Sequence, residues 1–124
     1  TDRHEHILIV DDEPMICNLA TEMLTHLGYR VESVSSGEEA LTYLAASPVD
    51  LVIIDMLMGA GLNGRETYER IINRLPDIKA LIASGYSESD EVKKALNLGA
   101  NGYIQKPYGL DQLAKAVKTV LHSN

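Results

Sequence analysis

The chain has 124 residues, close to the commonest size of one domain, and its 45% hydrophobic content is ordinary for a globular protein with one core. Its formal net charge of −7 argues against a broad basic surface for nucleic acid or anionic lipid. No apolar run approaches the roughly 20 residues of a membrane helix, so we expect a cytoplasmic protein without a membrane partner. Residues 1–124 are expected to form one domain that makes no direct contact with nucleic acid, with flexible ends at 1–5 and 122–124.

Five short segments of strand length, most of them apolar throughout, recur along the chain, at residues 7–10, 31–34, 51–54, 80–83 and 103–104. Runs that are apolar without alternation are typical of strands buried on both faces, as in a parallel sheet covered by helices. Each run is followed by a segment with the spacing of an amphipathic helix. The alternation predicts an α/β domain of five βα units, (βα)5, with parallel strands and right-handed crossovers.

The expected helices carry recognisable end signals. Pro14 lies in the first turn of the first helix, and Gly28 stands where a left-handed residue would end it. Ser36 and Glu39 have the capping-box spacing at the start of the second helix. Cys17, the only cysteine, falls in the first helix, where we expect a buried and inert thiol. The apolar faces consist of Ile16, Ala20, Met23, Leu24 and Leu27 in the first helix, Ala40, Leu41 and Leu44 in the second, Tyr68, Ile71, Ile72 and Leu75 in the third, Val92, Ala95 and Leu96 in the fourth, and Leu110, Leu113, Ala114, Val117, Val120 and Leu121 in the fifth.

Polar and ionisable residues gather where the expected strands end. In open sheets of this kind, ligand sites lie beyond the carboxyl ends of the strands, where the strand order reverses. Any one of these residues alone could be a cap, a turn residue or a surface side chain, but their shared edge favours one polar site. They are Asp11, Asp12 and Glu13 after the first strand, Asp55 after the third, Ser84 after the fourth and Lys106 after the fifth.

Carboxylates that converge at one edge need a cation or a shifted protonation state, since two of them about 4 Å apart repel by around 4 kcal/mol at an effective dielectric near 20. Asp11, Asp12 and Asp55 could supply carboxylates to Mg²⁺, which prefers oxygen ligands and keeps water and phosphate oxygens in its coordination sphere. Lys106 could reach a phosphoryl oxygen or pair with Asp55, and Ser84 could donate a hydrogen bond to the same group. One of these carboxylates could itself be a nucleophile, because aspartyl phosphates are established covalent intermediates. Asp55 is the best placed, because it ends the central strand and a Gly-rich loop follows it.

These segments resemble the receiver domain of two-component response regulators. The resemblance covers nearly the whole chain and is carried by ILIVDDE, DLVIIDMLM, ALIASGYS and GANGYIQKPY. It implies a flavodoxin-like, doubly wound sheet of five parallel strands in the order 2-1-3-4-5. The SGY segment is similar to receivers that are attached to hybrid histidine kinases.

The resemblance also implies a role for each residue of the site. Asp55 would accept a phosphoryl group from the phosphohistidine of a histidine kinase or phosphotransfer domain. Mg²⁺ would be held by Asp55, by Asp12 directly, by Asp11 through water and by the backbone carbonyl of Leu57. Lys106 would neutralise the phosphoryl charge. The only enzymatic chemistry implied is phosphotransfer to Asp55 and its dephosphorylation.

A switch is implied as well. Ser84 would hydrogen-bond the phosphoryl group and move inward, and Tyr103 would then turn into the space behind it. The surface formed by residues 88–121 would change and bind a downstream protein or a second receiver.

The loop after Asp55 departs from the family pattern. Gly59 stands where the family usually has proline, and Gly64 lies nine residues after the aspartate instead of eight. One residue has therefore been inserted, and a loop with Gly59, Gly61 and Gly64 is expected to be more mobile than usual.

Two alternative functions remain open. A non-switching interaction domain of the same fold would keep the acidic pocket, and loss of Asp55 or Lys106 would favour it, but both are present. A Mg²⁺-dependent phosphohydrolase that works through an aspartyl phosphate would have an Asp-x-Asp pair and a cap domain, whereas Asp11 and Asp12 are adjacent. A small phosphodonor distinguishes a receiver from a phosphohydrolase, because it leaves a stable mass increase on a receiver but is turned over by a hydrolase.

Overall fold

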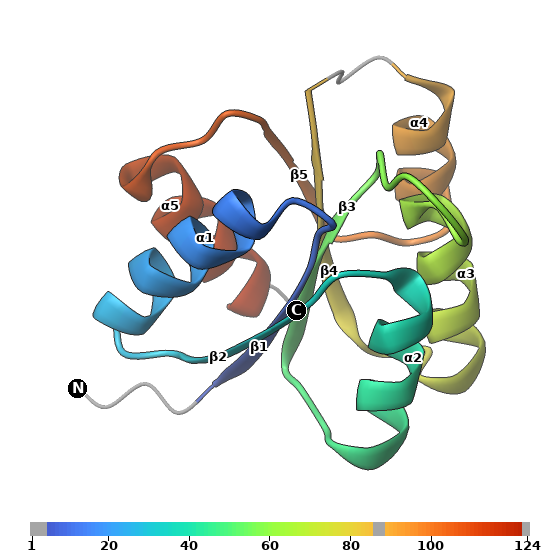
Figure 1. Cartoon of the computed structure of the whole chain (residues 1–124), viewed down its shortest axis with the longest axis horizontal. Coiled ribbons are helices and arrows are strands. Elements are labelled where there is room, and N and C mark those ends of the chain that lie inside the picture. Colours follow the sequence, from blue (N-terminus) through green and yellow to red (C-terminus); the bar gives the residue numbers. More distant parts are fainter. Residues whose placement is uncertain (1–4, 86–88, 123–124) are drawn as a thin grey trace.

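The computed structural model describes residues 5–85 and 89–122. The expected flexible residues 1–4 and 123–124, and residue 88 of the expected signalling surface, lie outside the described residues. Strands and helices alternate along the chain, as the hydrophobic pattern predicts (Figure 1). Their bounds are β1 (His6–Val10), α1 (Pro14–His26), β2 (Arg30–Val34), α2 (Gly37–Ala46), β3 (Leu51–Asp55), α3 (Gly64–Arg74), β4 (Lys79–Ser84), α4 (Asp90–Asn97), β5 (Gly102–Gln105) and α5 (Leu110–Leu121).

The five strands form one parallel sheet in the order β2-β1-β3-β4-β5, which confirms the flavodoxin-like fold class. The register brings the carboxyl ends of the strands to the same edge, because Val10 pairs with both Val34 and Ile54, and Ser84 pairs with Gln105. The strand order reverses between β1 and β3, so the loops that follow these two strands flank the expected site.

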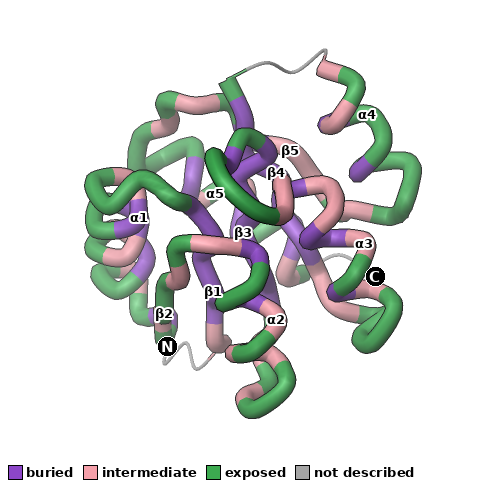
Figure 2. The backbone as a smooth tube through the Cα atoms, turned by 45° about the vertical axis from the view of Figure 1, so that its right-hand side comes forward, coloured by how far each residue is buried: buried purple, intermediate pink, exposed green. Residues whose placement is uncertain are grey.

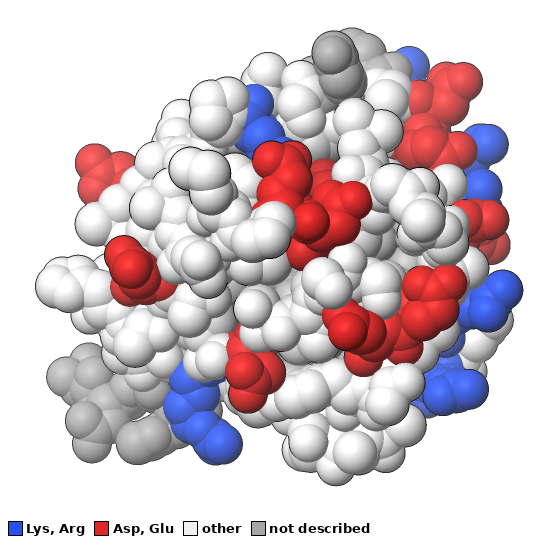
Figure 3. Space-filling model, in the orientation of Figure 1, with Lys and Arg blue, Asp and Glu red and all other residues white. Residues whose placement is uncertain are grey.

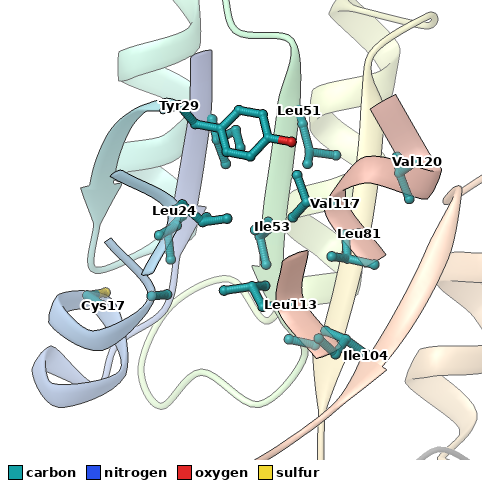
Figure 4. Packing of buried hydrophobic residues seen from close by; sticks show 14 residues of the cluster. Cys17, Leu24, Tyr29, Leu51, Ile53, Leu81, Ile104, Leu113, Val117 and Val120 are labelled. Atoms are coloured by element: carbon teal, nitrogen blue, oxygen red, sulfur yellow. The ribbon is translucent and has the colours of Figure 1, made fainter. Parts of the chain in front are cut away.

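Two apolar cores lie on opposite faces of the sheet. Successive side chains of a strand point to opposite faces, so Ile7 and Ile9 of β1 join one core while Leu8 and Val10 join the other. Helices α1 and α5 cover the first core, and α2, α3 and α4 cover the second (Figure 1). Figure 4 shows part of the first core, where side chains of α1 and α5 such as Leu24 point toward the strands.

The central strands are buried on both faces, as predicted, but the two edge strands are not. All five residues of β3 are buried, whereas Arg30, Glu32 and Ser33 of β2 are exposed, as is Gln105 of β5 (Figure 2). The prediction of full burial is therefore wrong for β2 and β5. An edge strand has a neighbour on one side only, and its helices cover it incompletely.

Helix ends were predicted in part. Gly28 has a φ of 97°, so the left-handed residue after α1 is confirmed. The Ser36 side chain accepts a hydrogen bond from the Glu39 amide, but the Glu39 carboxylate accepts from Ser35 rather than Ser36, so half of that capping box forms. Cys17 is buried on α1, as expected. No helix within residues 5–85 and 89–122 is long and apolar enough to cross a membrane.

Candidate functional site

The structure brings together the polar residues that end the strands. Asp11 directly follows β1, Asp55 ends β3, Ser84 ends β4, and Lys106 directly follows β5. Three of them are almost completely buried, namely Asp11, Asp55 and Ser84. Figure 3 shows acidic side chains gathered near the middle of this face of the molecule, over the region where β1 and β3 end. The shared edge predicted from the sequence is therefore a real cluster of side chains.

Lys106 lies between two buried carboxylates. Its Nζ is 2.9 Å from Asp11 Oδ2 and 3.3 Å from Asp55 Oδ1, and the more exposed Glu13 carboxylate is 3.8 Å away. Burial disfavours the charged amine, but the hydrogen bond to Asp11 and the charges of Asp55 and Asp11 outweigh it, so the pKa of Lys106 is raised. The predicted pairing of Lys106 with Asp55 is present, and Asp11 is an even closer partner.

The Asp55 carboxyl is held in a dry and electrostatically costly position. Its side chain is 2% exposed, and Oδ1 accepts a hydrogen bond of 3.3 Å from the Leu57 amide. Among the described residues, nothing donates a hydrogen bond to the buried Oδ2. Desolvation, followed by the negative charge of Asp11, raises the pKa of Asp55 to about 6, although Lys106 opposes the rise. The unpaired oxygen is the atom most in need of a cation or a new covalent partner.

Asp11, Asp12 and Asp55 can converge on one metal ion. One carboxylate oxygen from each lies within 4.8 Å of the others. Three carboxylates, with one buried oxygen that has no partner in the described part of the chain, fit a hard divalent cation such as Mg²⁺, which binds oxygen ligands and retains water. Leu57 is exposed and donates its amide to Asp55, while its carbonyl as a ligand stays a prediction.

Ser84 and Tyr103 are in contact, but through the backbone of Ser84. The Ser84 carbonyl accepts hydrogen bonds from the Tyr103 hydroxyl at 2.8 Å and from the Lys106 amide at 2.9 Å. Tyr103 is half-buried against the core that α4 helps to form. A shift of Ser84 would therefore act on both Tyr103 and the residue that carries the site's positive charge.

Sequence reasoning named Gly64 in the loop between β3 and α3 but not its close approach to the strand, and it missed three other residues that shape this loop. Gly64 begins α3 so close to the strand that a Cβ there would lie 2.2 Å from the Asp55 carbonyl oxygen. Asn63 and Glu66 form a complete capping box, which the pattern N-x-x-E could have revealed. Glu38 accepts a hydrogen bond from the Leu62 amide across the gap between α2 and the loop, and no sequence motif marks that contact.

Comparison with known proteins gives the family. The chain matches the response regulator receiver domain over residues 7–118. It is 33% identical over 118 residues to sporulation initiation phosphotransferase F of Bacillus subtilis, an alignment that covers 95% of this chain and 94% of that protein. It is 34% identical over 113 residues to an NtrX-like response regulator of Rickettsia bellii, covering 90% of this chain but 24% of the relative, so the chain spans about a quarter of that protein's length.

Similarity to a solved structure supports the same conclusion. A CheY-like response regulator receiver domain protein from Methanospirillum hungatei superimposes with a TM-score of 0.90 at 28% sequence identity, covering 96% of this chain and 94% of that one. The five parallel strands in the order 2-1-3-4-5 and the helices on both faces agree with that likeness. The chain belongs to the response regulator receiver domain family.

Proposed function

We propose that this domain is a phosphorylation-dependent switch that accepts a phosphoryl group on Asp55 from the phosphohistidine of a histidine kinase or phosphotransfer domain. The observation that carries the proposal is the buried Asp55 Oδ2, which has no hydrogen-bond donor among the described residues and lies beside a lysine and two further carboxylates. Such an oxygen is costly to keep in the resting state and gains partners when it is phosphorylated.

The chain's own residues can support the transfer. With a pKa of about 6, the Asp55 carboxyl is mostly ionised at pH 7 and can attack phosphorus while the phosphorus–nitrogen bond breaks and the imidazole leaves. Lys106, already 3.3 Å from Asp55, supplies positive charge beside the incoming oxygens. Asp11, Asp12, Asp55 and the carbonyl of Leu57 would hold Mg²⁺, which when bound neutralises phosphoryl charge.

The switch would begin at Ser84, which lies at the end of β4 next to Asp55 on β3. A phosphoryl oxygen offers the Ser84 hydroxyl a charge-assisted hydrogen bond, worth on the order of 1.5 to 3 kcal/mol. Inward movement of Ser84 would carry the carbonyl that holds Tyr103. The change would then reach the surface formed by α4, β5 and α5, where a downstream protein or a second receiver would bind.

Phosphorylation of Asp55 can be tested by intact mass after treatment with acetyl phosphate and Mg²⁺. We expect one stable, Mg²⁺-dependent phosphoryl adduct on the unmodified sequence and on the control Asp77→Asn, whose carboxylate is exposed. The Asp55→Asn variant should carry none. Equal labelling of Asp55→Asn would place the acceptor elsewhere, and turnover of the donor without an adduct would favour the phosphohydrolase alternative.

The switch can be tested by amide NMR spectra of the beryllofluoride-bound domain. Ser84→Ala should still bind beryllofluoride but show smaller shift changes at Tyr103 and along α4, while Ser84→Thr, which keeps the hydroxyl, should behave like the original sequence. Unchanged spectra of α4 and β5 on binding in the original sequence would favour the non-switching alternative. The cytoplasmic location and the single domain over residues 1–124 stay predictions.

A further inference from the structure

The loop between β3 and α3, residues 56–63, is tied directly to a candidate metal ligand. The Gly59 amide donates a hydrogen bond of 2.7 Å to Asp12 Oδ2, across a separation of 47 residues in the sequence. Asp12 is the exposed member of the carboxylate cluster, so solvent alone would leave its side chain free to rotate. The Gly59 amide instead holds one oxygen of this carboxylate.

The loop has a second anchor, on α2. Glu38, in the first turn of α2, accepts a hydrogen bond of 3.2 Å from the Leu62 amide. Its carboxylate also approaches Gly61 so closely that a Cβ at that residue would lie 2.7 Å from Oε2, and Gly61 has a φ of 78°. The loop is therefore fixed between Asp12 on one side and Glu38 on the other, in a conformation that requires glycine at position 61.

We propose that the Gly59 backbone amide is a positioning group for the Mg²⁺ ligand Asp12, and that Glu38 keeps this amide in place. The inference rests on the proposed function, because it takes Asp12 to be a metal ligand. A carboxylate that is oriented by a hydrogen bond before the ion arrives loses less freedom on binding, which is why outer partners of metal ligands affect affinity. Proline, which the family usually has at this position, lacks the amide hydrogen, so the glycine makes the contact possible.

The coupling also runs from the metal to the loop. Because linkage is reciprocal, Mg²⁺ that binds an ordered Asp12 must favour the loop conformation in which Gly59 donates to it. The amides of Gly59 and Leu62 should therefore exchange their hydrogens more slowly when Mg²⁺ is present.

The first experiment is a Mg²⁺ titration of the chain followed by NMR, with Gly59→Pro compared with Gly59→Ala. Proline removes the amide hydrogen and should weaken Mg²⁺ binding by at least about tenfold. Alanine keeps the hydrogen, although its Cβ would lie 3.3 Å from Asp12 Oδ2, so its affinity should stay close to that of the original sequence. Equal affinities for all three proteins, or an equal loss in both variants, would overturn the proposal.

The second experiment changes Glu38, which holds the loop but is not a proposed metal ligand. It tests the proposal even if Gly59→Pro does not fold. Glu38→Ala should weaken Mg²⁺ binding and speed exchange of the Gly59 amide, whereas Glu38→Gln keeps an acceptor for the Leu62 amide and should do so less. Urea unfolding of the same proteins without metal separates the roles. Lower stability of Glu38→Ala with unchanged Mg²⁺ affinity would show a structural role only and refute the coupling, while failure of the original sequence to bind Mg²⁺ would refute the proposed metal site.

Discussion

Asp55→Asn should stabilise the metal-free domain at neutral pH. The substitution keeps the size and shape of the side chain but removes a carboxylate that is 2% exposed and faces the negative charge of Asp11. The ion pair of 2.9 Å between Lys106 and Asp11 stays intact. The substitution therefore removes the Asp55 carboxylate, which is costly to ionise in the folded state, and keeps the ion pair between Lys106 and Asp11.

The magnitude follows from the pKa of Asp55, which burial and then the charge of Asp11 raise from 3.8 to about 6. A rise of about two pH units corresponds to about 3 kcal/mol of unfolding free energy, since each unit is worth about 1.4 kcal/mol. The folded state binds the proton more tightly than the unfolded state, so this contribution to stability falls as pH rises from about 4 to about 6 and stays low above that. Below about pH 4, both states are protonated and the cost vanishes.

Urea unfolding between pH 4 and pH 8 in the presence of a chelator would measure this effect. Asp55→Asn should be more stable than the original sequence by up to about 3 kcal/mol at pH 7.5, with the gap closing toward pH 4. The exposed control Asp77→Asn should show no such pH-dependent gap. A destabilised Asp55→Asn at pH 7.5, or a gap of equal size at both ends of the range, would refute the reasoning.

Two further substitutions test the charge balance and the packing around Asp55. Lys106→Met leaves the buried Asp11 and Asp55 without their cation, so it should lower the unfolding free energy by about 3 kcal/mol at pH 7.5 and by less at pH 5, as measured in urea. Gly64→Ala would place a Cβ 2.2 Å from the Asp55 carbonyl oxygen and should cost about 2 kcal/mol or more, measured by thermal unfolding. Gly85→Ala, whose Cβ would meet nothing within 4 Å, is the matched control, and equal losses in the two alanine variants would contradict the close-approach argument.

Local pattern was sufficient to predict most of the site because all strands of a parallel sheet end at the same edge. Asp11, Asp55 and Lys106 each follow an apolar run, so their convergence follows from the alternation of strands and helices. Their pairing does not follow from it. The sequence predicted an ion pair between Lys106 and Asp55. In the folded chain the Lys106 amine lies closer to Asp11, at 2.9 Å, than to Asp55, at 3.3 Å.

The local sequence pattern also did not predict which carboxylates of the cluster are exposed to solvent. Asp11 and Asp12 are adjacent and chemically identical, but the first is buried beside Lys106 and the second is exposed beside Gly59. Both residues follow the end of β1, and only the surrounding elements decide which of the two side chains is closed off from solvent. The same reason explains why the edge strands β2 and β5 are less buried than their apolar runs suggested.

The sequence by itself determined the five βα units, the edge that carries the site and the residue types in it, because hydrophobic periodicity and strand ends are local properties. Tertiary structure alone decided that Gly59 donates to Asp12, that Leu62 donates to Glu38 and that Asp55 keeps one oxygen without a hydrogen-bond donor among the described residues. The two hydrogen bonds join segments far apart in the chain, and both use backbone N–H groups, which every residue except proline possesses. A backbone donor has no signature in the sequence, so its partner is known only when the loops are placed in space.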